Sequence, residues 1–169
     1  LRSVLVERDP ATGCVTNMPT VTRPDMSLDG MRYSYTQTWA RTEGCAPGLP
    51  DTGEVRKDTG ELVSSAPGTV ALSANGRWAR YERGSSFAVV NLDTGKSEDL
   101  GTLITFGVKQ KGRQVANDGT TVIAFRSPVV YVKCPGLERE FVTLPEAIFD
   151  TATIADSGNF ALLQTRQPI

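Results

Sequence analysis

A turn signature recurs along the chain about every forty residues and limits the possible folds more than any other feature of the sequence. Each copy places Gly after a polar residue, between two runs typical of β-strands: Ser27-Leu28-Asp29-Gly30, Ser73-Ala74-Asn75-Gly76, Ala116-Asn117-Asp118-Gly119 and Ala155-Asp156-Ser157-Gly158. Gly, with Asn or Asp beside it, supplies the positive φ that a tight hairpin turn requires. The four glycines are separated by 46, 43 and 39 residues. The sequence therefore predicts four hairpins at a regular interval.

A second turn signature, ending in Thr-Gly, lies about half a period away. Its copies are Ala11-Thr12-Gly13, Asp58-Thr59-Gly60 and Asp93-Thr94-Gly95, with Cys134-Pro135-Gly136 as a degenerate fourth. Each unit then contains four strands, joined by a D/N-G turn, a loop and a T-G turn. One such sheet cannot bury both of its faces alone and must stack on its neighbours. The prediction is an all-β fold, a β-propeller of four four-stranded antiparallel blades.

The blade boundaries follow from the turns. Blade 1 combines residues 151–169 with 1–17, and the others span 18–65, 66–103 and 104–150. Counting from Gly158 across the termini to Gly30 gives 41 residues, which predicts a ring closed by antiparallel pairing of residues 2–8 with 159–165. Closure would also pair strand edges that otherwise invite aggregation. Two other arrangements stay open: a fragment of a larger propeller, and a half-ring that dimerises.

The segments Ala71 to Tyr81 and Ala88 to Gly95 carry a resemblance to a known family. They are similar to the Ser-Pro-Asp-Gly turn and the strand ending in an Asp-and-Gly turn of the TolB-type β-propeller repeat, which is related to the tryptophan-aspartate repeat propellers. The resemblance extends over nearly the whole chain but is specific only in the turns. The Pro of the family turn is absent here, and the unit spanning residues 18–65 carries an insertion around residues 41–59. The resemblance implies a propeller fold.

Composition excludes several functional classes. The chain has no His, which removes Ser-His-Asp and Cys-His catalysis and His-ligated zinc. A net charge of -1 gives no electrostatic case for binding nucleic acid or an anionic membrane. The Asp-Thr-Gly tripeptides at Asp51, Asp58 and Asp93 are interpreted as turns rather than protease carboxylates, because Glu or Lys follows each Gly. No metal or cofactor is predicted, and catalysis is not expected from this chain.

The cysteines and the first residues bear on location. Cys14, Cys45 and Cys134 have no C-x-x-C spacing; a disulfide between Cys14 and Cys45 and three buried reduced thiols are both consistent with the sequence. No apolar run approaches the length of a membrane helix, so no membrane insertion is expected. A first residue of Leu is typical of a processed or excised segment. We predict a periplasmic or extracellular location.

The candidate site lies on the face opposite the turns. D/N-G and T-G turns should share one face, which leaves the longest connections, residues 39–52, 101–112 and 143–150, on the other. Long loops on a rigid sheet commonly carry binding sites. Trp39 ends a strand beside the longest insertion, whereas Trp78 should be buried. The candidate binding residues are Trp39, Arg41, Glu43, Lys109, Lys111 and Glu146.

Two hypotheses of function remain. The first is a non-catalytic propeller module that binds a protein or glycan partner, including a second copy of itself, through the long-loop face. The second is the propeller portion of a larger hydrolase or other enzyme, whose catalytic residues lie outside this chain.

Overall fold

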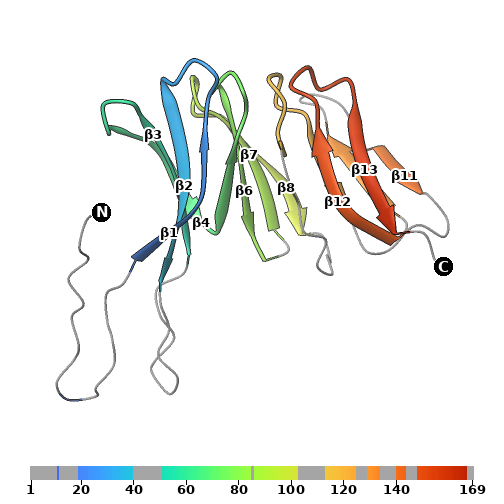
Figure 1. Ribbon diagram of the computed structural model, residues 1–169, viewed down its shortest axis with the longest axis horizontal. Helices are drawn as coiled ribbons and strands as arrows, with labels where there is room; N and C mark the ends of the chain where they lie inside the picture. Colours follow the sequence, from blue (N-terminus) through green and yellow to red (C-terminus); the bar gives the residue numbers. More distant parts are fainter. Residues whose placement is uncertain are drawn as a thin grey trace.

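A computed structural model describes residues 11, 19–39, 51–84, 86–102, 113–124, 129–133, 140–143 and 148–166 (Figure 1). Within these ranges the chain forms thirteen β-strands and no helix. Accordingly, no helix in the described part is long and apolar enough to cross a membrane. The predicted all-β class is confirmed.

The first two units each form a complete four-stranded antiparallel sheet. In the first sheet the strands follow chain order: β1 (Pro19–Met26), β2 (Arg32–Trp39), β3 (Thr52–Lys57) and β4 (Leu62–Pro67). The second sheet has the same order: β5 (Thr69–Leu72), β6 (Trp78–Arg83), β7 (Ser86–Asn91) and β8 (Ser97–Thr102). Both match the predicted succession of strands and turns.

The rest of the chain forms smaller antiparallel sheets within the described ranges. The third sheet contains β9 (Thr121–Ala124), β10 (Val129–Lys133) and β11 (Glu140–Thr143), and the last is a hairpin of β12 (Ile148–Ile154) and β13 (Ala161–Arg166). The strand predicted before Gly119 is reduced to one bridge, between Val115 and Thr121. The third unit therefore has three strands here where four were predicted.

The D/N-G turns form because side chains close them locally. Ser27 donates its hydroxyl to the Asp29 carboxylate at 2.6 Å and accepts the Arg32 N–H at 3.0 Å. In the second unit, Ser73 donates to Asn75 at 2.8 Å and accepts the Trp78 N–H at 3.0 Å. The glycines of all four turns have φ between 69° and 88°, a region that favours Gly. All four predicted turns are observed.

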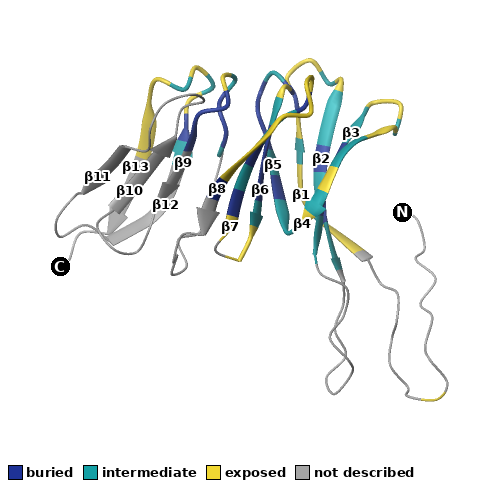
Figure 2. Cartoon of the chain, turned by 180° about the vertical axis from the view of Figure 1, so that it is seen from behind, coloured by how far each residue is buried: buried dark blue, intermediate teal, exposed yellow. Residues whose placement is uncertain are grey.

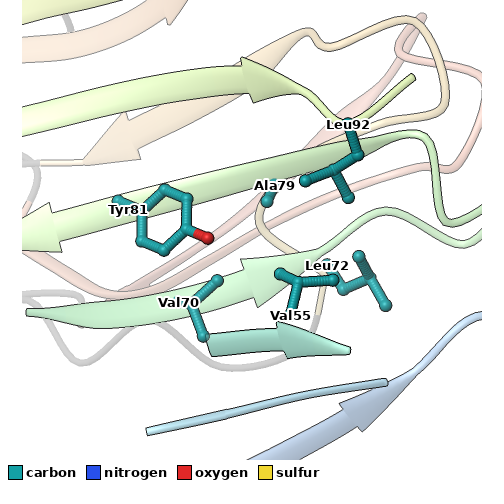
Figure 3. Close-up of a cluster of buried hydrophobic side chains, with 6 residues drawn as sticks. All are labelled: Val55, Val70, Leu72, Ala79, Tyr81 and Leu92. Atoms are coloured by element: carbon teal, nitrogen blue, oxygen red, sulfur yellow. The ribbon is translucent and has the colours of Figure 1, made fainter. Parts of the chain in front are cut away.

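The core lies between neighbouring sheets. Figure 3 shows the main cluster, in which Val55 of the first sheet packs with five residues of the second, Val70, Leu72, Ala79, Tyr81 and Leu92. A second cluster joins the second sheet to the third unit and contains Phe87, Val89, Leu100 and Val115. Dark blue in Figure 2 accordingly concentrates where sheets face one another. Each sheet is stabilised by its neighbours, as expected for a chain whose single sheets cannot bury both faces.

The sheets stand side by side in an open row (Figure 1). The first sheet lies at one end of this row, and β12 and β13 lie toward the other end together with β11, in both Figure 1 and Figure 2. The predicted closing partner of β13, residues 2–8, lies outside the described residues. Closure of the ring within one chain therefore remains a prediction.

Candidate functional site

Hydrogen bonds connect the four D/N-G turns into one continuous chain, which we call the turn ladder. The N–H of Leu28 donates to the Ala74 carbonyl at 2.7 Å. Asn75 donates its backbone N–H to the Asn117 side-chain oxygen at 2.7 Å and its side-chain amide to the Asn117 carbonyl at 2.9 Å. The N–H of Asn117 then donates to the Asp156 carbonyl at 2.8 Å. The ladder crosses every junction between units.

The two T-G turns within the described residues, at 58–60 and 93–95, lie beside the ladder, as predicted. The Asp58 N–H donates to the Met31 carbonyl at 3.0 Å, and the Leu92 N–H to the Arg77 carbonyl at 2.8 Å. An ion pair also links the first two units, in which the Arg32 guanidinium donates to the Asp93 carboxylate at 2.9 Å. Both kinds of turn therefore share one face, which we call the turn face.

The interpretation of the three Asp-Thr-Gly tripeptides is right in part. Asp58 accepts the N–H of Thr59 at 2.9 Å, as a turn-forming Asp should. Asp93 instead pairs with Arg32, and Asn91 closes its turn by accepting the N–H groups of Asp93 and Thr94. The first tripeptide is not a turn, because Thr52 and Gly53 begin β3. The same three letters occur in a strand and in turns because flanking residues decide the conformation.

Comparison with solved structures identifies the architecture. The β-propeller domain of Cps50 (Swd1) from Myceliophteria thermophila superposes with a TM-score of 0.56 at 11% identity, over 91% of this chain and 53% of that one. A functionally unknown protein from Desulfotomaculum acetoxidans DSM 771 superposes at 0.53 with 14% identity, over 88% and 50%. The chain has a β-propeller fold.

A third likeness is to Porphyromonas gingivalis dipeptidyl peptidase 4, with a TM-score of 0.54 at 11% identity over 96% of this chain and 33% of that one. The chain thus spans about half, or less, of the length of these structures. No family model and no curated sequence matches it. The sheets are from here on called blades and are counted along the chain, so that the first blade is the β1–β4 sheet and the second is the β5–β8 sheet.

Arg113 ties three blades together close to the turn ladder. Its guanidinium donates to the Leu72 carbonyl of the second blade at 2.9 Å and to the Asp156 carboxylate of the last hairpin at 3.1 Å. It also lies 3.6 Å from the Asp25 carboxylate of the first blade. Its backbone carbonyl accepts the Ile154 N–H at 2.9 Å. A cation with these partners holds blades together.

Arg80 is a second arginine between blades, and its side chain is fully buried. The Arg80 guanidinium pairs with Glu82 at 2.8 Å and lies 5.2 Å from the centre of the Phe87 ring. Burial lowers the pKa of Arg80, and the Glu82 carboxylate opposes that shift. Favourable pairing with a carboxylate and an aromatic face makes the buried charge tolerable.

A polar network lies on the first blade. Tyr35 donates its hydroxyl to Glu54 at 2.6 Å and accepts from Arg56 at 2.8 Å, while the Tyr33 ring stacks on Tyr35 with centroids 6.1 Å apart. Burial raises the pKa of Tyr35, and the bond to Glu54 raises it further. No group of three or more Cys, Asp or Glu side chains among the described residues is arranged to hold a metal.

Most predicted site residues fall where the structure makes no statement. Trp39 ends β2, where it pairs with Pro19, at the opposite end of the hairpin from the turn; its side chain is outside the described residues. The others outside these residues are Arg41, Glu43, Lys109, Lys111, Glu146, Cys14 and Cys45. The long-loop site and the disulfide therefore stay predictions.

The prediction that Trp78 is buried needs a correction. Tyr81, on the same strand, is 4% exposed and packs between blades. Trp78 is only partly buried, although it was predicted to be buried, and it packs against the edge of the Phe87 cluster. It stands at the first position of β6 beside the turn, where it stays partly exposed. Alternation within a strand does not describe burial at the strand's end.

The structure also shows apolar side chains that sequence patterns missed. On the first blade, Met26 is 60% and Leu28 79% exposed; on the last hairpin, Phe160 is 75% and Leu162 70% exposed. We call the first pair the front face and the second pair the rear face. They lie on the first and the last unit along the turn ladder. Aligning the units by their turns makes Met26 equivalent to the buried Leu72, but the sequence alone does not show which units lie at the ends of the row.

Hydrogen bonds in the first D/N-G turn stabilise the ionised form of Asp29, so the stability of this turn depends on pH. The Ser27 hydroxyl, and then the Met31 N–H, lower the pKa of Asp29 below its ordinary 3.8. A lowered pKa means that this contribution to stability is present above about pH 3.8 and is lost as the pH falls through the lowered value. Ser27→Ala should move the Asp29 pKa upward, measured by NMR titration of its carboxyl carbon. Leu28→Ala is the control and should leave it in place; an unchanged pKa in Ser27→Ala would contradict the assigned contact.

Proposed function

We propose that this chain is a non-catalytic propeller module that binds a protein or glycan partner through the long-loop face. The turn ladder is the observation that carries this proposal. Backbone and side-chain groups of the turn face are engaged with one another across each junction. Such bonds serve to fix the blades as a platform, and loops on a fixed platform are well placed for recognition.

The other charged groups that contact more than one blade have the same architectural role. Arg32 bridges to Asp93, and Arg113 bridges to Leu72 and Asp156. Trp39 lies at the opposite end of β2 from these contacts. Trp and Arg contribute a disproportionate share of interface energy, which supports Trp39 and Arg41 as anchors. The likeness to the Cps50 (Swd1) propeller domain supports the propeller platform on which the loops stand. A periplasmic or extracellular location is part of this proposal and rests on the sequence alone.

The second candidate is a propeller portion of a larger hydrolase. It is favoured by the likeness to dipeptidyl peptidase 4, of which this chain spans only 33%. The sequence of the full-length gene distinguishes the two candidates. A hydrolase domain in the same polypeptide would support the second.

Substitution of the two anchors tests the binding proposal. Trp39→Ala and Arg41→Ala should each weaken binding at least tenfold, because truncating an anchor typically removes about 2 kcal/mol. Binding is measured on a glycan array and against candidate periplasmic or extracellular proteins, then by calorimetry with any ligand found. Lys57→Ala removes a side chain that is 44% exposed beside a T-G turn; this control should bind normally. Equal binding by all three variants would contradict the proposed face.

A further inference from the structure

We infer that the front face and the rear face are the two halves of one interface, and that a second copy of this chain occupies them. In this arrangement the rear face of each copy packs on the front face of the other, and two open rows close into one ring. The inference does not rest on the proposed ligand-binding role, because it involves the end blades rather than the long loops.

The front face has the composition of a blade junction without its neighbour. Aligning the turns makes Met26 equivalent to Leu72, and Leu28 equivalent to Ala74. Leu72 and Ala74 are both 0% exposed, and Leu72 packs in the cluster that contains Val55 of the preceding blade. Met26 and Leu28 are 60% and 79% exposed. The first blade therefore presents the surface that a preceding blade covers elsewhere in the row.

The rear face shows the complementary situation. Phe160 is equivalent to Trp78, and Leu162 to Arg80. Trp78 packs against a cluster containing Val115 of the next unit, and Arg80 is fully buried with a long contact, 3.5 Å, to the hydroxyl of Thr121. Phe160 and Leu162 are 75% and 70% exposed. The last hairpin therefore presents the surface that a following blade covers elsewhere.

The same alignment predicts which residues meet. Val115, which Trp78 approaches through its cluster, is equivalent to Met26. Phe160 of one copy should therefore pack against Met26 of the partner subunit, a thioether–aromatic contact that is favourable in proteins. The four side chains that define the two faces are uncharged, so their contact buries no charge of their own.

A second copy is the occupant that fits these faces best. A front face follows a rear face at each internal junction, and one further copy supplies both at once. Head-to-tail contacts of this kind form a closed ring when the rotation allows it. The chain spans 50% of one matched protein and 53% of the matched propeller domain, so two copies would supply the blades of one such ring. Exposed apolar side chains grouped in this way commonly mark an interface.

Sedimentation equilibrium of the full chain tests the inference. The expected mass is twice the 18.2 kDa of one chain. Phe160→Glu and Met26→Lys should each reduce it to 18.2 kDa, and the double variant should restore the dimer at low salt through a new ion pair. Leu62→Asp, at a 48% exposed position on β4, is the control and should remain a dimer. Circular dichroism confirms that each variant is folded.

Several results would overturn the inference. A wild-type chain of 18.2 kDa at every concentration would show that the end faces close on one another or stay free. A dimer that survives both single substitutions would place the contact elsewhere. Masses that increase without limit would show open polymers instead of a two-copy ring. Loss of partner binding in Trp39→Ala with an intact dimer would leave this inference standing, so the two proposals can fail separately.

Discussion

Replacing Gly68 by Ala is expected to lower the free energy of unfolding by about 3 kcal/mol. Gly68 joins the first blade to the second and has a φ of 106°, a conformation that costs an L-residue about 1 to 2 kcal/mol. A methyl group there would also collide with the backbone carbonyl of Glu82. Forcing the backbone apart typically costs a further 1 to 3 kcal/mol or so. Urea denaturation at constant m-value measures the loss.

Gly84→Ala is the matched control for this prediction. Gly84 also has positive φ, at 59°, but an added methyl group would meet nothing within 4 Å. Its substitution should therefore cost only about 1 to 2 kcal/mol, from backbone strain alone. If Gly68→Ala lost no more stability than Gly84→Ala, the result would contradict the close approach of Gly68 to the Glu82 carbonyl of β6.

Leu72→Ala should be comparably damaging, with a loss of about 2 to 5 kcal/mol. Leu72 is 0% exposed and lies in the cluster that joins the first two blades (Figure 3). Truncation leaves a cavity at a junction where facing blades cannot collapse without moving whole sheets. Leu62→Ala, at a position 48% exposed, should stay within about 0.5 kcal/mol. Thermal and urea unfolding measure both variants. If Leu72→Ala lost no more stability than Leu62→Ala, the junction between the first two blades would not be part of the core.

The turns and hairpins could be predicted from sequence because their chemistry is local. Ser27, Asp29 and Gly30 close one turn within four residues, and the same pattern holds at Ser73 and Asn75. Only the first Asp-Thr-Gly was misread, since nothing within the tripeptide separates a turn from the start of β3. Short-range hydrogen bonding therefore accounts for the part of the fold that the sequence reveals.

Contacts between blades could not be predicted in the same way. The bond from Asn75 to Asn117 joins residues 42 positions apart, and no local pattern in the sequence marks which turns will touch. The role of Arg113 could not be predicted from the sequence either, because its partners come from three different units. The front and rear faces depend on which blades lie at the ends of the row. The exposure of Met26 and Phe160 is thus a property of the assembly of blades.

Hydrogen exchange tests most directly whether the four turn units form one set of blades held by the turn ladder. The N–H groups of Leu28, Asn75 and Asn117 donate across the junctions. Turn amides commonly exchange fast, whereas amides that open only with the core exchange at the rate of global unfolding. We predict that these three amides are protected like those of β6. Exchange at the rate of free turn amides would contradict the ladder and, with it, the account of the fold.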